Sequence, residues 1–129
     1  MKIHESAENY LETILVLSKT KSEVRSIDIA NELGFSKPSV SVAMKNLRNS
    51  GCIVMDDHGH ITLTEEGLKI ANGVLERHTV ISQLLIGLGV DKDIALEDAC
   101  RMEHVVSQET FEAMRKHAPK FKLQVSENE

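Results

Sequence analysis

Hydrophobic residues recur at helical spacing through the first fifty positions of the chain. A first helix is predicted over about residues 7–19, with Ser6 as its N-cap and an apolar stripe made by Tyr10, Leu11, Ile14, Leu15 and Leu17. A shorter helix is predicted over residues 27–33, with Ser26 as its N-cap and Gly34 just beyond its end. A third helix is predicted from Ser36 or Lys37 to about Ser50. Pro38 is tolerated there because an amide in the first turn has no intrahelical partner. Two helices joined by a tight turn predict a helix-turn-helix.

The third predicted helix has one apolar face and one polar face. Val40, Met44 and Leu47 repeat at i, i+4 and i+7 and are expected in the core, whereas Ser39, Ser41, Val42, Lys45 and Arg48 are left for solvent or DNA. No Arg or Asn stands on the leading turns for a bidentate base contact, so readout is expected to rely on shape and on phosphate contacts. The predicted DNA-binding residues are Ser36, Lys37, Pro38, Ser39, Ser41, Val42 and Lys45.

Two short runs with β propensity follow. Residues 52–55 and 61–63 flank the turn-rich segment 56–60, which predicts a hairpin. His58 and His60 lie in that turn and are either phosphate or metal contacts or, as is more common for exposed turns, solvated side chains. Helix, helix-turn-helix and hairpin in this order predict a winged helix.

Helical spacing returns after the hairpin and continues almost to the end. Thr64 is predicted to cap a long helix that Gly73 and Gly87 to Gly89 allow to bend or break. Another helix is expected to start at Asp91 or Asp93, and Ser107 to cap a last one containing Phe111 and Met114. The predicted fold class is mainly α with a small β-hairpin. It comprises a winged helix-turn-helix DNA-binding domain (1–63), a helical metal-binding and dimerisation domain (64–117) and a polar, frayed tail (118–129).

Length and composition are those of an ordinary globular chain. The chain has 129 residues, and its longest nearly apolar run, residues 84–90, is far shorter than the ~20 residues of a membrane helix, so no membrane association is expected. The amino-terminal segment lacks a signal-peptide apolar stretch, so a cytoplasmic location is expected. Cysteines are reduced in that compartment. Cys52 is therefore read as a core thiol and Cys100 as a possible ligand.

The charge is divided unevenly along the chain. The net charge is −5, yet residues 1–55 contain seven Lys or Arg against six Asp or Glu, so the acidic excess belongs to the rest of the chain. Residues 36–51 contain three basic residues and no acidic one, which a phosphate backbone could use. Three charges are also common on a solvated helix face.

The segment 98–104 carries the most specific chemistry. Cys100, Glu103 and His104 stand at i, i+3 and i+4, which on a helix puts their Cβ atoms about 5–6 Å apart on one face. Sulfur, nitrogen and oxygen ligands together suit Fe(II), Zn(II), Co(II) or Ni(II) better than Ca(II) or Mg(II). The alternative is that Cys100 is a buried small residue and that Glu103 and His104 belong to a solvated face. His78 is a further candidate ligand, although a single histidine on a helix is usually structural.

Two stretches resemble one protein family. The segments 35–41 and 97–107 are similar to those of the metal-dependent bacterial repressors related to the diphtheria toxin repressor and the manganese transport regulator, and the resemblance covers roughly residues 6–116. It implies a homodimeric repressor, without enzymatic activity, that a divalent ion, Fe(II) or Mn(II), activates to bind a palindromic operator of double-stranded DNA. The genes implied are those of iron or manganese homeostasis.

The resemblance also implies a set of metal ligands, comprising Asn9, Glu12, His78, Cys100, Glu103 and His104. Binding an ion would then tie the DNA-binding module to the dimerisation helices and set the spacing of two recognition helices. Operator half-sites that lie one turn of the DNA duplex apart require the two recognition helices, one from each subunit, to be about 34–36 Å apart.

The ligand set departs from both branches of the family, and other functions stay open. Asn9 matches neither the iron nor the manganese branch, Cys100 is similar to the iron branch, and Glu12 is similar to the manganese branch. One alternative is a metal-independent winged-helix regulator. Another is a small metallohydrolase with Glu103 as a general base. The chain has no H-E-x-x-H or G-x-S-x-G motif, which argues against the hydrolase.

Overall fold

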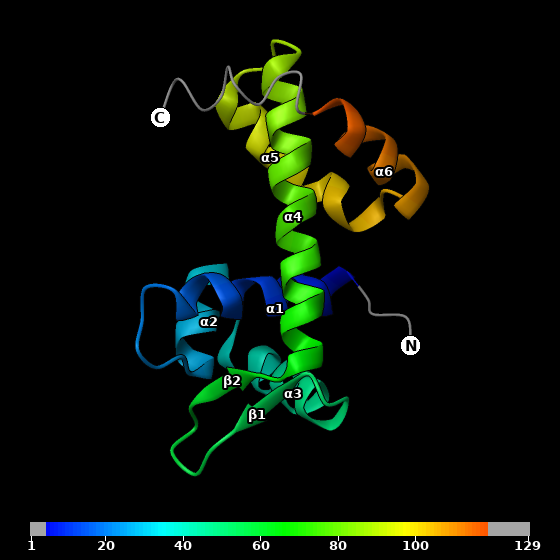
Figure 1. Ribbon diagram of the computed structural model, residues 1–129. Helices are drawn as coiled ribbons and strands as arrows, with labels where there is room; N and C mark the ends of the chain where they lie inside the picture. Colours follow the sequence, from blue (N-terminus) through cyan, green and yellow to red (C-terminus); the bar gives the residue numbers. More distant parts are fainter. Residues whose placement is uncertain (1–4, 119–129) are drawn as a thin grey trace. The chain divides into compact units, whose positions relative to one another are not determined.

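A computed structural model describes residues 5–118, which form two compact units, one ending at Gly73 and the other beginning at Val74. The elements of this part of the chain are α1 (Glu5–Ser18), α2 (Ser26–Leu33), α3 (Lys37–Asn49), β1 (Ile53–Met55), β2 (Ile61–Leu63), α4 (Glu65–Gly87), α5 (Lys92–Val105) and α6 (Gln108–His117) (Figure 1). These helices and the single β-hairpin confirm the predicted mainly α class with a winged helix-turn-helix.

The first unit packs α1, α2 and α3 around one apolar core. Its most deeply buried side chains include Leu11, Ile14, Ile29, Val40 and Met44. The predicted inward face of α3 is confirmed, since Leu47 is buried as well. The prediction that Ser6 caps the first helix is wrong. Helix α1 already includes Glu5 and Ser6, because Glu and Ala favour the helix and nothing in this stretch ends it.

The turn between α2 and α3 forms as the sequence predicts. Gly34 adopts a left-handed φ of 70° and its N–H donates to the carbonyl of Ala30, so the C-cap prediction is confirmed. The Ser36 hydroxyl accepts from the Ser39 N–H at 3.3 Å and caps α3. At the other end of α2, Ser26 is not the N-cap. The backbone N–H of Arg25 instead donates to the Asp28 carboxylate at 2.9 Å, so this pair closes the first turn.

The hairpin pairs antiparallel, with Ile53 opposite Leu63 and Met55 opposite Ile61. Its connecting loop extends beyond the helices of the first unit (Figure 1). Where the hairpin leads into α4, Gly67 lies so close to the strand that a Cβ there would be 2.0 Å from the carbonyl oxygen of Cys52. Thr64 caps α4, since its hydroxyl accepts from the Gly67 N–H at 3.1 Å. Cys52 is buried, as expected for a core thiol.

The second unit contains the carboxyl-terminal part of α4 with α5 and α6. Helix α4 runs through Gly73 to Gly87, so Gly73 does not break the helix. Asp91 caps α5 through the Asp93 N–H, and Ser107 caps α6 through the Thr110 N–H, as predicted. The domain limits 1–63 and 64–117 stay predictions, because the first compact unit ends at Gly73, inside α4. Except for Ala118, the predicted tail lies outside the described residues.

Candidate metal centre and nucleic-acid interface

The last turn of α5 brings a buried carboxylate against two imidazole rings. Glu103 is only 1% exposed. Its Oε2 lies 3.0 Å from Nδ1 of His78 on α4, and its Oε1 lies 3.3 Å from Nε2 of His104. Three of the residues predicted as metal ligands, from two helices of the second unit, are therefore in direct contact.

These contacts are short but are not hydrogen bonds. Neither oxygen of the Glu103 carboxylate accepts a hydrogen bond from a described residue, although both are buried. A buried carboxylate without donors is costly, because it has lost its hydration and gained nothing in return. Two interpretations account for the distances. Either the histidines are protonated ion-pair partners, or the three side chains converge on a common ion.

The geometry fits ligands that share one ion. Nitrogen or oxygen ligands about 2.0–2.2 Å from an ion such as zinc lie roughly 3.0–3.5 Å from each other, and their lone pairs point at the ion instead of at one another. The observed separations of 3.0 and 3.3 Å fall in this range. The lack of hydrogen-bond alignment agrees with it too. One carboxylate and two imidazoles also match the donor types that divalent transition metals take.

The remaining predicted ligands are placed, but the structure does not test their roles. Cys100 lies one turn before Glu103 on α5 and is exposed, not a buried core residue. Asn9 and Glu12 lie on α1 in the first unit and are half-buried. The backbone carbonyl of Asn9 accepts from the Thr13 hydroxyl at 2.8 Å, so that oxygen already has a side-chain donor.

Helix α3 presents a polar, exposed face with a basic residue at each end. The seven residues predicted to contact DNA are all exposed, and Val42 keeps 61% of its surface. The Ser36 hydroxyl donates to the Ser39 hydroxyl at 2.8 Å, which leaves the Ser39 O–H as the outward donor. This surface supplies hydroxyls, one apolar contact and lysines to a nucleic acid, and its DNA-contact roles stay predictions.

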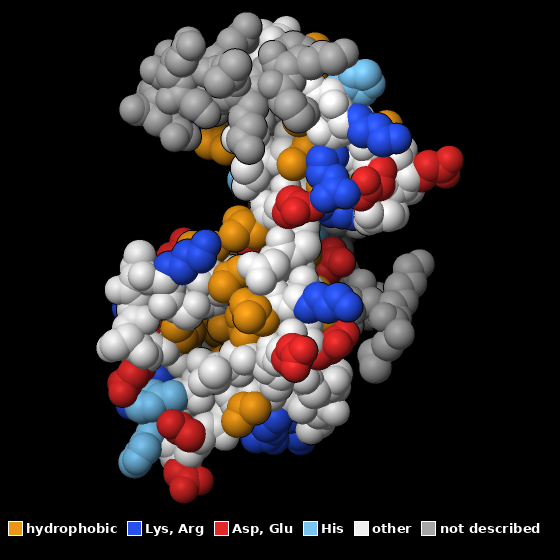
Figure 2. Space-filling view, viewed as in Figure 1, with side chains coloured by type: hydrophobic (Ala, Val, Ile, Leu, Met, Phe, Trp, Pro, Cys, Tyr) orange, Lys and Arg blue, Asp and Glu red, His pale blue; other side chains and the backbone are white. Residues whose placement is uncertain are grey.

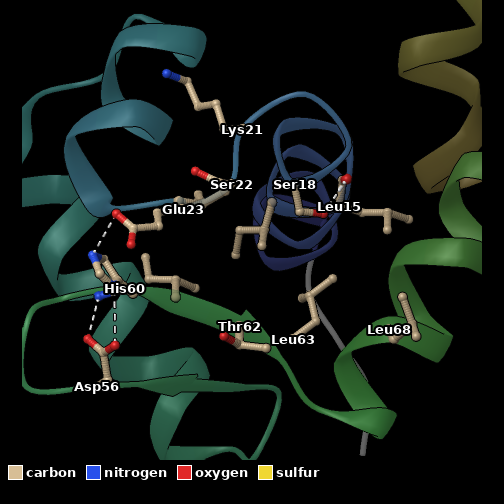
Figure 3. Close-up of a pocket in the computed structure, with 13 residues that line it drawn as sticks. Leu15, Ser18, Lys21, Ser22, Glu23, Asp56, His60, Thr62, Leu63 and Leu68 are labelled. Carbon is tan, nitrogen blue, oxygen red and sulfur yellow. Dashed lines mark hydrogen bonds and ion pairs between the residues drawn. The ribbon is translucent and has the colours of Figure 1, made fainter.

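A network of charged side chains fixes the base of the hairpin. Arg25 Nη2 donates to His60 Nε2 at 2.9 Å. Glu23 Oε2 lies 3.1 Å from the same nitrogen, and Asp56 Oδ2 lies 3.1 Å from Nδ1 of His60 (Figure 3). The backbone N–H of Ile61 adds a hydrogen bond of 2.7 Å to the segment before α2. His60 is therefore a half-buried anchor of the β1–β2 hairpin, which is the wing of the winged helix. Its place in a turn-rich segment did not predict this role.

Glu23, Asp56 and His60 also line one side of a pocket of about 430 Å³ in the first unit. Its apolar side comes from α1, β2 and the start of α4, with Leu15, Leu63 and Leu68 among the lining residues (Figure 3). Figure 2 shows apolar side chains gathered on this face of the first unit, with histidine and acidic side chains together over the hairpin. The charged rim belongs to the wing and the apolar wall to the core.

Asp56 holds the wing loop through its carboxylate. Oδ1 accepts the backbone N–H groups of His58 and His60, each at 2.9 Å. The pKa of Asp56 lies below its usual 3.8, chiefly because of the hydrogen bond from the His60 backbone, with that from His58 and the two imidazoles adding to the effect against desolvation. The exposed carboxylate is thus ionised at neutral pH.

The contacts that Arg77 makes near the candidate metal centre were not predicted from the sequence. Arg77 lies beside His78 on α4 and contacts the end of α5 and the start of α6. An arginine beside a candidate ligand is the only signal in the sequence, and many arginines on helices are merely solvated.

Fold and site together define a DNA-binding protein of the winged-helix class that carries a candidate metal centre in a helical second unit. Comparison with known proteins agrees with this class. Residues 2–61 match the family model described as the iron dependent repressor N-terminal DNA binding domain, and residues 64–124 match the iron dependent repressor metal binding and dimerisation domain. The chain belongs to the iron-dependent repressor family.

Individual relatives support the same assignment. The transcriptional regulator MntR of Escherichia coli O157:H7 is 40% identical over 111 residues, which cover 86% of this chain and 72% of the relative. An HTH-type transcriptional regulator of Methanocaldococcus jannaschii is 32% identical over 123 residues, covering 94% of this chain and 98% of the relative.

Solved structures of metal regulators have the same fold. A manganese-dependent transcriptional repressor in complex with manganese aligns with a TM-score of 0.80 at 26% identity, covering 88% of this chain and 52% of its own. The manganese regulator SloR aligns with a TM-score of 0.75 at 28% identity, covering 90% and 54%. The chain thus spans about half the length of these solved regulators. Among residues 5–118, no helix is long and apolar enough to cross a membrane.

Proposed function

We propose that this protein is a metal-activated transcriptional repressor that binds a palindromic operator as a homodimer and controls genes of iron or manganese homeostasis. The observation that carries the proposal is the buried Glu103 carboxylate, which faces His78 and His104 and accepts no hydrogen bond from any residue in the described part of the chain. It lies in the segment matched to the family's metal binding and dimerisation domain. The proposal includes no catalytic step and places the protein in the cytoplasm.

The ligands of the ion are taken to be His78, Glu103 and His104, joined by Cys100 and, through the family resemblance, by Asn9 and Glu12. A bound divalent ion, Fe(II) or Mn(II), supplies positive charge that offsets the buried carboxylate. The manganese named in the similar repressor complex supports Mn(II), and a Cys100 thiolate would favour Fe(II). Because the proposed ligands belong to α1, α4 and α5, binding of the ion would be coupled to the spacing of the two recognition helices, which are the α3 helices of the two subunits.

The DNA contacts are assigned to the exposed face of α3. Lys37 and Lys45 bind phosphates, and Ser36, Pro38, Ser39, Ser41 and Val42 form the surface facing the groove. Serine hydroxyls can donate to phosphates or bases, and Val42 can contact a thymine methyl. Readout depends on DNA shape more than on bidentate pairs, since α3 carries neither Arg nor Asn on its first turns.

The decisive experiment is fluorescence anisotropy on a labelled fragment of the protein's own promoter. The protein is titrated under anaerobic conditions after chelation, and then with Mn(II) or Fe(II), at one fixed salt concentration because phosphate contacts depend on salt. One of these metals is expected to tighten specific binding at least tenfold, or about 1.4 kcal/mol.

Two variants and one control connect the response to the site. Glu103→Ala and His104→Ala are expected to stay folded and lose the metal response. Glu97→Ala should behave like the parent, because Glu97 is an exposed residue on the same helix whose side chain pairs, within the described part of the chain, with Arg101 alone. If both site variants keep the parent's response, the ligand assignment is wrong. If metal does not alter the parent's binding to a fragment that the chelated protein already binds, a metal-independent regulator is the better account.

A further inference from the structure

Glu103 and His104 lie at the carboxyl-terminal end of α5, where the last backbone carbonyls have no donor within the helix. Helix α5 ends at Val105, and the last intrahelical-type bond is from the Val106 N–H to the Met102 carbonyl. The last carbonyls of any helix have no intrahelical donors, and helix ends fray. The carbonyl of Glu103 is one of these groups. A fraying last turn would move the very residues, Glu103 and His104, whose side chains face His78.

Arg77 supplies donors to this end of α5. Its Nη1 donates to the carbonyl of Glu103 at 3.2 Å and to that of Val106 at 2.7 Å. Its Nη2 donates to Oε1 of Gln108, the first residue of α6, at 2.9 Å. The guanidinium lies over the ring of Phe111, 5.2 Å from its centroid, which holds the fork in place. One side chain on α4 therefore binds the last turn of α5 and the start of α6.

We propose that Arg77 is a positioning residue for the metal centre. By bonding to the last turn of α5, Arg77 keeps that turn ordered, so that the Glu103 carboxylate stays in contact with His78, the residue that follows Arg77 on α4. This inference rests on the proposed function, since it concerns the same site. The positive fork also faces the negative end of the helix dipole. Groups that orient metal ligands from behind typically change metal affinity by about 10- to 100-fold when removed.

Arg115 offers a matched control. It also joins α4 to α6, through an ion pair of 3.2 Å with Glu76, and it too lies over Phe111, at 5.8 Å. Its other hydrogen bonds within residues 5–118 go to Glu112, and none of them reaches a carbonyl of α5. Arg115→Ala therefore removes a cation from Phe111 and a connection between helices, without touching the last turn of α5.

The test measures the affinity of the full chain for Mn(II) itself, from the electron paramagnetic resonance signal of the free ion, well below the melting temperature of each variant. Arg77→Ala is expected to raise the Mn(II) dissociation constant at least tenfold, and Arg115→Ala to leave it within twofold of the parent's. Arg77→Lys keeps the charge but lacks the rigid fork, so an intermediate loss is expected. If Arg77→Ala fails to fold, the Mn(II) dissociation constant of Arg77→Lys provides the test. A dissociation constant equal to the parent's in the Arg77 variants would overturn the proposal.

A second measurement needs no metal. Amide hydrogen exchange of the chelated protein should show faster exchange at the end of α5, Met102 to Val106, in Arg77→Ala but not in Arg115→Ala. Unchanged protection there would overturn the positioning role as well. If the parent binds neither Mn(II) nor Fe(II), the metal-site proposal fails by itself, and the exchange data still decide whether Arg77 orders the last turn.

Discussion

Replacing Glu103 by glutamine separates a metal ligand from an ion-pair partner. The amide has nearly the same shape as the carboxylate but no charge. If the buried carboxylate awaits an ion, its removal relieves a desolvation cost in the metal-free protein. If it is instead paired with protonated His78 and His104, its removal leaves buried positive charge without a partner, which typically costs about 3–5 kcal/mol. The two interpretations therefore predict opposite effects on the metal-free protein.

The magnitudes are large enough to measure. Unfolding entropy of about 2.1 cal/mol/K per residue amounts to roughly 0.27 kcal/mol/K for a chain of 129 residues. Metal at 100 times its dissociation constant stabilises the folded state by about 2.7 kcal/mol. The parent's melting temperature should then rise by about 10 °C. Loss of a buried ion pair, at about 3–5 kcal/mol, would lower the melting temperature of the metal-free variant by about 11–18 °C.

The assay is thermal unfolding followed by circular dichroism, with and without Mn(II), for the parent, Glu103→Gln and the exposed control Glu97→Gln. We expect metal-free Glu103→Gln to melt at or above the parent's temperature and to gain nothing from Mn(II), while the control behaves like the parent. A metal-free variant that melts about 11–18 °C below the parent would identify an ion pair. A full Mn(II) shift in the variant would remove Glu103 from the ligand set.

Three further predictions concern the first unit. Gly67→Ala should destabilise the protein by about 1–3 kcal/mol or more in urea unfolding, because its Cβ would meet the Cys52 carbonyl at 2.0 Å; the control Gly73→Ala, with open space around its Cβ, should be neutral or stabilising, and equal stability of the two would refute the clash. Asp56, whose pKa is lowered, stabilises the wing above its unfolded pKa, and this stabilisation is lost as pH falls through the lower folded value. The protection factors of the wing amides, which compare their hydrogen exchange with the intrinsic rate at the same pH, should therefore fall below about pH 4 in the parent. In Asp56→Ala they should be lower already at neutral pH; protection factors that do not change with pH in the parent would contradict this. Lys37→Ala should weaken binding to all DNA sequences and flatten the salt dependence of log K by about 0.9; an unchanged slope would remove Lys37 from the phosphate contacts.

The local features of the first unit could be predicted from sequence because each depends on neighbouring residues. Apolar spacing indicated the inward face of α3, and Gly34 and Ser36 marked the turn between two helices. Backbone sterics and capping act within about one turn, so they are visible in a short segment. Helix starts were less certain. Ser6 and Ser26 both looked like caps, but a cap forms only where the chain leaves the helix.

The candidate site could be predicted only in part. Spacing placed Glu103 and His104 on one face of a helix, and the resemblance added His78. Only the tertiary structure decided that the Glu103 carboxylate is buried without a donor among residues 5–118, that Cys100 is exposed, and that Arg77 donates to a carbonyl at the end of α5. The reason is physical. Periodicity decides which side of a helix faces inward, whereas the atoms that meet across two helices depend on side-chain direction and packing, which bring together residues far apart in the chain.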